Sequence, residues 1–246
     1  MINKRRDFVI VLSLLFAVSF AIIHFSTKYM VFIKRAPRSR FLSFAGGIAV
    51  SYVFIHLLPD LNTHQQVLEK ADNGVLQFVE NHAYLMALFG LAFFYGLENM
   101  VSRETKKKQS HAGSGIFWIH IGTFFFYNML IGYLLIQEEF DHMMGMFFYF
   151  LALSVHFVTV DQSMRETHQY VYDQYGRWAL TVAVLVGWLI GAFTKLEEAL
   201  ISTMFAFLSG ALMLNVLKEE LPKESDSSFS SFAVGLIIYS ILLLIA

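Results

Sequence analysis

Polar side chains lie inside several long apolar stretches of the sequence, where each needs either a partner or a function. His156 is near the middle of the stretch Met144–Ser163, and Thr159 follows three residues later, so the two can share one face of a helix. An ionisable side chain inside a membrane helix is by default a candidate for binding or moving an ion. The alternative is a neutral histidine that is hydrogen-bonded to Tyr127, Asn128 or a backbone carbonyl and holds two helices together. For Thr159 the alternative is a hydrogen bond to its own helix backbone.

A second set of polar side chains follows one face of the stretch Gly115–Ile136. His120 precedes Tyr127 by seven residues, which places both on the same helical face, with Thr123 between them. This stripe either lines a path through the membrane or packs one helix against another. His56 lies near the end of its own apolar stretch, where an interfacial histidine costs little, and it is a further candidate for lining a path.

The chemistry open to these residues is restricted by what the chain lacks. There is no cysteine, which excludes disulfides and thiolate metal sites, so any metal would be bound by nitrogen and oxygen donors. The sequence contains no phosphate-cradling glycine loop, no His-Glu-x-x-His pair and no nucleophile elbow, and it therefore does not indicate an enzyme. The net charge of −1, with basic residues at helix ends, gives no indication of a nucleic-acid partner.

The elements that must position these side chains are expected to be membrane helices. Of the 246 residues, 57% are hydrophobic and 15% are charged, whereas about one quarter of an average soluble domain is charged. Apolar stretches of about 20 residues recur, which is the helix length that crosses the hydrocarbon core of a bilayer. We predict an all-α bundle forming a single transmembrane domain, with eight spans at Phe8–Ser26, Phe41–Leu58, His82–Val101, Gly115–Ile136, Met144–Ser163, Trp178–Phe193, Glu198–Leu217 and Phe229–Ala246.

The connections between these spans are short and polar, except for Pro59–Asn81 and Ser102–Ser114. The first span has an alternative interpretation as a signal peptide, because basic residues precede its apolar run and small residues occur within it. The run continues past the point of cleavage to Phe25, and the repeat described below requires a helix here.

The distribution of positive charge predicts the orientation. With the amino terminus outside, most of the 18 lysines and arginines fall in cytoplasmic loops, although three basic residues at the amino terminus argue the other way. We therefore expect a multi-pass protein of the cell membrane with both termini outside. Charged residues at the cytoplasmic helix ends are expected to be solvated or paired at the surface: Glu98 with Arg103, and Glu219 and Glu220 beside Lys218.

An internal repeat relates the second span to the seventh. Residues 44–59 align without gaps on residues 207–222, and because the seventh span comes five crossings after the second, the two segments should run in opposite directions. An inverted repeat of this kind is typical of transporters. The matched pairs are Phe44 with Phe207, Gly47 with Gly210, Val53 with Val216, Leu58 with Leu221 and Pro59 with Pro222.

At these residues the chain resembles the ZIP (Zrt/Irt-like) family of metal transporters. The second span of that family carries small residues and ends in His-Leu-Leu-Pro-acid, which this chain matches with Phe44-Ala45-Gly46-Gly47 and His56-Leu57-Leu58-Pro59-Asp60. The glycine-containing start and acidic Leu-Pro end of the seventh span are matched by Ser209-Gly210 and Glu219-Glu220-Leu221-Pro222. The resemblance implies eight helices, with one to three related to six to eight around a central pair.

The resemblance also implies a metal site between spans four and five. The family motif His-Asn-x-x-Asp-Gly of span four corresponds to Tyr127-Asn128-Met129-Leu130-Ile131-Gly132, which lacks the histidine and the acid. Aligning His156 with the first histidine of span five places Phe157 and Val160 where an acid and a second histidine are expected, and Asp161 is a poor substitute because it lies well around the helix. The implied metal ligands are Asn128 and His156, with Tyr127, His120, Thr159 and His56 lining the pathway.

Two neutral donors bind a divalent cation poorly, because no fixed negative charge offsets the lost hydration. The resemblance predicts transport of zinc, iron or manganese by alternating access, with the metal as substrate, no cofactor, and an activity weakened or altered by the missing ligands. Two alternatives stay open: a non-transporting binding or regulatory protein on the same scaffold, and a transporter of another solute such as protons or a small neutral molecule. The lipid bilayer is the expected partner, and a homo-oligomer stays open.

Overall fold

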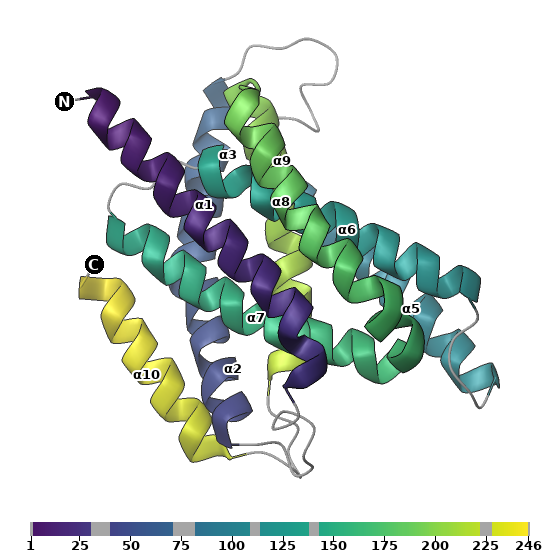
Figure 1. The fold of residues 1–246 in the computed structure, drawn as a ribbon. Coiled ribbons are helices and arrows are strands. Elements are labelled where there is room, and N and C mark those ends of the chain that lie inside the picture. The colour runs from purple at the N-terminus through teal and green to yellow at the C-terminus, as the bar shows by residue number, and fades with distance from the viewer. Residues whose placement is uncertain are drawn as a thin grey trace. The chain divides into compact units, whose positions relative to one another are not determined.

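The computed structural model describes residues 2–30, 40–70, 82–108, 114–137, 143–221 and 228–245. Every regular element in these ranges is a helix (Figure 1). The α-helices are α1 (Ile2–Ser26), α2 (Arg40–Tyr52), α3 (Leu58–Lys70), α5 (Ala83–Lys108), α6 (Ser114–Gln137), α7 (Met143–Val171), α8 (Arg177–Phe193), α9 (Glu198–Asn215) and α10 (Phe229–Ile245). Three short π-helical segments are η3 (Val53–Leu57), η4 (Tyr172–Gly176) and η5 (Val216–Glu220), and η1 (Thr27–Tyr29) is a 3-10 turn.

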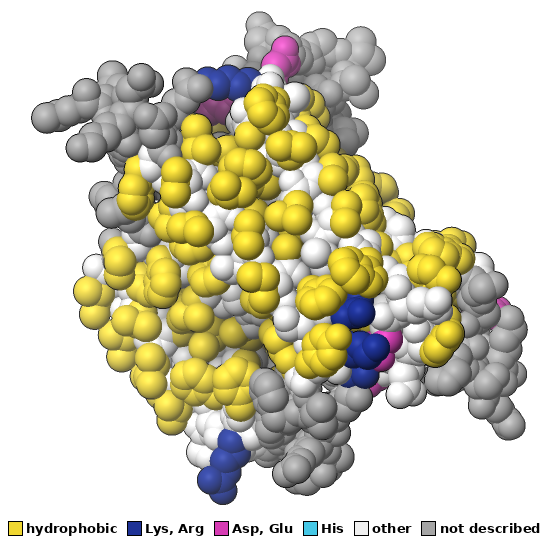
Figure 2. Space-filling model, in the orientation of Figure 1, with side chains coloured by type: hydrophobic (Ala, Val, Ile, Leu, Met, Phe, Trp, Pro, Cys, Tyr) yellow, Lys and Arg dark blue, Asp and Glu magenta, His cyan; other side chains and the backbone are white. Residues whose placement is uncertain are grey.

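Six of the described helical segments are long and apolar enough to cross a membrane. They are Phe8–Tyr29, Arg40–Lys70, Ala83–Glu104, Gly115–Gln137, Met144–Phe193 and Glu198–Glu220, and Phe229–Ile245 is a shorter apolar helix. On the face drawn in Figure 2, hydrophobic side chains cover most of the described surface. Large hydrophobic side chains are exposed throughout, as at Phe193 and Leu244, which suits contact with lipid. By helix length and hydropathy, the chain is an integral multi-pass membrane protein.

The helices extend beyond several of the predicted spans, so parts of the expected connections are helical. The connection predicted from Pro59 begins as α3, which continues the helical segment of α2 and η3 without a break. The connection predicted from Ser102 begins as the end of α5, which continues to Lys108. Residues 71–81 and 109–113, and Ala246 at the end of the predicted last span, lie outside the described residues. The predicted spans Met144–Ser163 and Trp178–Phe193 belong to one continuous helical segment, interrupted by η4.

The chain divides into two compact units. Unit 1 consists of Met1–Lys28, Leu97–Glu139 and Met164–Glu197, and unit 2 consists of Tyr29–Gly96, Phe140–Ser163 and Glu198–Ala246. Unit 1 therefore holds α1, α6 and α8 with the ends of α5 and α7. Unit 2 holds α2, α3, α9 and α10 with the beginnings of α5 and α7.

Within unit 2, glycines let two helix pairs approach backbone to backbone. A Cβ at Gly47 of α2 would lie 2.2 Å from the carbonyl oxygen of Phe232 in α10, and a Cβ at Gly235 would lie 2.1 Å from that of Phe44. The pair α5 and α9 repeats this arrangement, with Gly210 against Ala87 and Gly90 against Phe207. Small residues at such crossings are the usual basis of close helix packing in membranes.

The directions of these helices follow from their contacts. Ser43 of α2 accepts a hydrogen bond from the backbone of Ser228, and Ser51 bonds Leu236 and Ser240 further along α10, so α2 and α10 run parallel, side by side (Figure 1). By contrast, α3 packs on α9 whereas α2 packs on η5. The segment α2-η3-α3 and the segment α9-η5 therefore run in opposite directions within unit 2.

The π-helical segments η3 and η5 occupy matching positions of the sequence repeat, since Val53 aligns with Val216 and Leu57 with Glu220. In η3 the backbone N–H of Leu58 donates to the carbonyl of Val53, five residues earlier. Pro59 has no N–H for the helix ladder and its ring clashes with the carbonyl four residues before it, which loosens the preceding turn. Single π-turns inside α-helices are frequent at functional sites.

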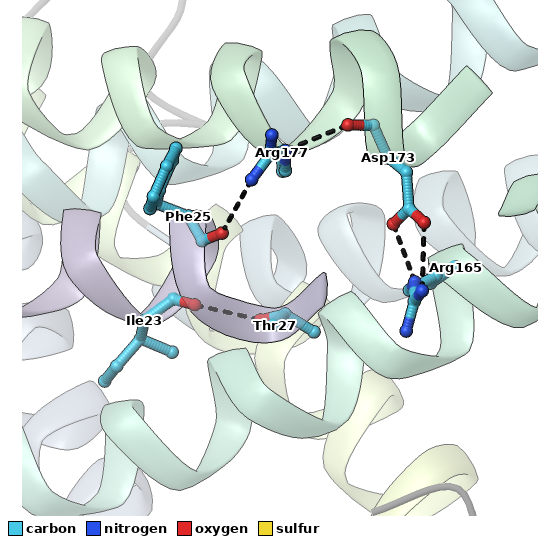
Figure 3. A network of polar contacts seen from close by, with 6 residues as sticks. All are labelled: Ile23, Phe25, Thr27, Arg165, Asp173 and Arg177. Atoms are coloured by element: carbon cyan, nitrogen blue, oxygen red, sulfur yellow. Dashed lines mark hydrogen bonds and ion pairs between the residues drawn. The ribbon is translucent and has the colours of Figure 1, made fainter. Parts of the chain in front are cut away.

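In unit 1, α6 and α8 pack closely and an arginine network holds the corner between α7 and α8 (Figure 3). Nε and Nη2 of Arg165 donate to the two carboxylate oxygens of Asp173, at 2.6 and 2.9 Å. Arg177 donates to the backbone carbonyl oxygen of Asp173 at 2.9 Å and to that of Phe25 at 3.2 Å. A cation at a helix C-terminus satisfies the last carbonyl groups, so Arg177 ties the end of α1 to the corner.

Candidate functional site

A fully buried ionisable pair joins His156 of α7 to Glu220 of η5, both in unit 2. Nδ1 of His156 lies 2.8 Å from Oε1 of Glu220, and the two side chains are 1% and 0% exposed. An ionised carboxylate only accepts hydrogen bonds, so Nδ1–H of the imidazole donates to it. Asp161, five residues after His156, is also fully buried.

The π-turn of η5 explains why Glu220, and not its neighbour, is turned inward. Asn215, at the end of α9, is buried, with 2% of its surface exposed. An α-helix repeats its face every three to four residues, which would bring Glu219 under Asn215. A π-turn takes one residue more, and Glu220 then occupies the inner face. Glu219 stays 25% exposed and pairs with Lys218 at 3.0 Å.

The burial of Glu220 corrects the expectation that Glu219 and Glu220 are both solvated. The sequence places them beside Lys218 at the end of an apolar stretch, which is typical of surface residues. A helical wheel assigns the wrong carboxylate to the interior, because the residue count changes at the π-turn. The signal that could have indicated Glu220 is its match with Leu57, an apolar position of the repeat.

The pair His156–Glu220 supplies what the predicted site lacked. The predicted ligands Asn128 and His156 are both neutral donors, whereas Glu220 adds a fixed negative charge to an imidazole. Imidazole nitrogen and carboxylate oxygen are both ligands of zinc and of other first-row divalent cations. A carboxylate–imidazole pair can equally hold a proton, since either group can carry it. The arrangement therefore suits a cation, either metal or proton.

The predicted ligand Asn128 belongs to unit 1, whereas His156 belongs to unit 2. Asn128 is 1% exposed and its amide donates to the carbonyl of Phe124 in its own helix at 2.8 Å, while its Oδ1 has no hydrogen-bond partner. An orphaned amide oxygen inside a membrane helix is the type of atom that binds a cation or water. Tyr127 is also buried and packs on Phe124.

Two other predicted pathway residues of unit 2 have local partners. Thr159 donates its hydroxyl hydrogen to the carbonyl of Val155 at 3.1 Å, which is the backbone bond named above as the alternative to lining a path. His56, in η3, lies 3.4 Å from Asp60 and packs beside Tyr52, with ring centroids 5.2 Å apart. The His56 side chain is 25% exposed, and the helical segment does not end there, as expected from the sequence, but continues through α3 to Lys70.

The side chain of His120 contacts two partners that the sequence did not indicate. Its Nδ1 lies 3.0 Å from Nε2 of His168 and its Nε2 lies 3.1 Å from Oε1 of Glu98, all within unit 1. Glu98 was expected to pair with Arg103, whereas Arg103 donates to Asn99 at 3.0 Å. Thr123 of the same predicted stripe donates to its own backbone at Ile119.

Among the described residues, no three His, Asp or Glu side chains are grouped so that they could hold a metal ion. Within the described part of the protein, a metal ion could therefore be bound by at most two such side chains together, as at His156 and Glu220. Comparison with known protein families finds none that matches the chain, and comparison with curated proteins finds no match.

Proposed function

We propose that the chain is a membrane transporter of a divalent metal cation of the zinc, iron or manganese class, built on a scaffold that resembles the ZIP family. The observation that carries the proposal is the buried pair His156–Glu220, at 2.8 Å, which joins α7 to η5. Its carboxylate offsets part of the hydration that a divalent cation loses on entering the protein. In this proposal, His156 releases its Nδ1 proton or transfers to the tautomer protonated at Nε2 as the cation enters, and the cation then binds the bare Nδ1 and the Glu220 carboxylate.

The geometry of unit 2 supports the inverted-repeat part of the proposal. The segments α2-η3-α3 and α9-η5 are antiparallel and carry their π-turns at matching positions. The glycine crossings of α2 with α10 and of α9 with α5 also match, since Gly47 corresponds to Gly210 and Phe44 to Phe207. Two mirrored halves that carry helix irregularities around a substrate site are the general design of many transporters.

The test is metal uptake by purified protein in lipid vesicles, with zinc, iron and manganese as separate substrates. Glu220→Gln keeps the shape and the hydrogen-bond acceptor but removes the charge, so we expect the uptake rate to fall at least about tenfold, equivalent to roughly 1.4 kcal/mol. Glu219→Gln is the matched control, because Glu219 is partly exposed and paired with Lys218. It should transport like the unchanged protein.

Uptake that is unaffected by Glu220→Gln would remove this site, and absence of uptake of all three metals by the unchanged protein would contradict metal transport. A second candidate function is transport of protons. It is favoured by the lack of any group of three His, Asp or Glu ligands among the described residues, since one His–Glu pair suffices to carry a proton. Vesicles that take up protons but no metal would support this second candidate.

A further inference from the structure

Unit 1 contains a second ionisable cluster, which the proposed function does not use. Glu98 of α5, His120 of α6 and His168 of α7 form a continuous chain, with contacts of 3.1 Å from Glu98 to His120 and 3.0 Å from His120 to His168. All three residues lie within helical segments long and apolar enough to cross a membrane. Ionisable residues in such segments are rare unless they have a function.

The donor atoms of Glu98, His120 and His168 are arranged in a way that does not suit a metal ion but suits the transfer of a proton. His120 uses one ring nitrogen toward Glu98 and the other toward His168, so the donors form a line and do not converge on one point. A neutral imidazole has one N–H and one bare nitrogen. It can therefore accept a proton at one nitrogen while it releases another proton from the opposite nitrogen.

We infer that the Glu98–His120–His168 chain is a proton-transfer relay. With Glu98 ionised, the carboxylate only accepts, so Nε2–H of His120 donates to Glu98 and Nε2–H of His168 donates to the bare Nδ1 of His120. A proton arriving at Nδ1 of His168 shifts the proton on its Nε2 to Nδ1 of His120. The proton on Nε2 of His120 then moves to Glu98. One proton enters, one carboxylate becomes neutral, and both hydrogen bonds reverse.

The surroundings of the three relay side chains favour proton transfer between them over loss of the proton to water. His120 and His168 are each 2% exposed, while the side chain of Glu98 is 18% exposed, so the carboxylate is the more accessible end. Phe124 packs edge-on against His120 and Phe117 against His168, each with ring centroids 5.2 Å apart. Hydrogen bonds in such a low-dielectric setting polarise one another.

Two charged groups that lie near these three side chains along the same helices are bound elsewhere. On α7, Arg165 lies one turn before His168 and is bound by both carboxylate oxygens of Asp173. On α5, Arg103 lies beyond Glu98 and donates to Asn99. Helix α6 carries no Lys, Arg, Asp or Glu. Both arginines therefore bind groups outside the cluster.

The relay is tested by proton uptake into vesicles that contain the purified protein and a trapped pH-sensitive dye, after an acid step, with the membrane potential clamped and all divalent metals chelated. His120→Gln can form hydrogen bonds but cannot pass a proton, so we expect uptake at least about tenfold slower. Glu98→Gln, which keeps the acceptor shape, is the second variant and should be similarly slow. His64→Gln is the control, because His64 bonds Ser202 in unit 2 and should leave uptake unchanged.

Thermal unfolding of each variant verifies that it is folded, and nitrogen NMR of histidine-labelled protein gives an independent readout. A coupling across the hydrogen bond between Nδ1 of His120 and Nε2 of His168 is expected, and it should be lost in His168→Gln. Uptake by the unchanged protein no faster than in protein-free vesicles, or unchanged rates in both Glu98→Gln and His120→Gln, would overturn the inference. Because metals are absent, these outcomes are independent of the metal proposal.

Discussion

At the scale of single residues, the proposed cation site consists of two ionisable side chains, His156 and Glu220, that are buried together. Removing a carboxylate and an imidazole from water costs free energy, which their attraction offsets only when the geometry is good. The 2.8 Å contact between His156 and Glu220 meets that condition. A protein that needed only a packed core could use apolar residues here, and the proposed cation site rests on this pair.

The pair can be tested by a double-mutant cycle. His156→Leu leaves the Glu220 carboxylate buried without its imidazole, so we expect the free energy of unfolding to fall by roughly 3–5 kcal/mol. The double variant His156→Leu/Glu220→Leu removes both groups and should regain most of that loss. Thermal unfolding in detergent measures the unchanged protein, both single variants and the double variant. Effects that simply add would show that the two side chains do not interact.

His156 could be found from the sequence because its residue type contradicts its apolar surroundings. Glu220 could not, because its inward direction depends on a π-turn that changes the residue count of the helix by one. The relay partners of His120 could not be predicted from the sequence either. Glu98 and His168 come from two other helices, and which helices become neighbours is a property of the fold that helical periodicity does not contain.

At the scale of elements, glycines at helix crossings fix which helices meet. The sequence predicted the long apolar helices, since apolar stretches of membrane length are a strong signal, but it did not predict which helices pack together. In both units, two helices approach through a pair of glycines, as Gly132 and Gly187 do in α6 and α8. Each glycine faces a backbone carbonyl, so a side chain there has no room.

This packing predicts the effect of single methyl groups. A Cβ at Gly210 would lie 1.7 Å from the carbonyl oxygen of Ala87, so Gly210→Ala should separate α9 from α5 and lower stability by about 1–3 kcal/mol. Gly122→Ala is the control, because a Cβ at Gly122 has no neighbour within 4 Å. Thermal unfolding in detergent compares the two. Equal melting temperatures for both variants would contradict this crossing.

At the scale of the whole molecule, the chain combines membrane helices with ionisable sites in each of two compact units. The pair His156–Glu220 lies in unit 2 and the relay around His120 lies in unit 1. The membrane character was predictable from composition, because the apolar fraction leaves too few polar residues to cover a water-soluble surface. The eight crossings and the outside location of both termini stay predictions.

The division into two units could not be predicted, because each unit combines segments from distant parts of the sequence. The helices α5 and α7 each contribute their two ends to different units, at Gly96/Leu97 and Ser163/Met164. The residue pattern of a continuous helix does not indicate where such a boundary between units falls. The resemblance to the ZIP family suggested a central metal site, but only contacts in the folded chain indicate which carboxylate accompanies His156.

The most direct test of the central claim is zinc binding to the purified protein, measured as zinc-dependent thermal stabilisation together with the amount of zinc bound at equilibrium. We predict stabilisation of the unchanged protein and of Glu219→Gln, and its loss in Glu220→Gln and in His156→Gln. Stabilisation by zinc that survives both of the latter substitutions, or zinc that binds none of the four proteins, would contradict the assignment of His156 and Glu220 as the cation site.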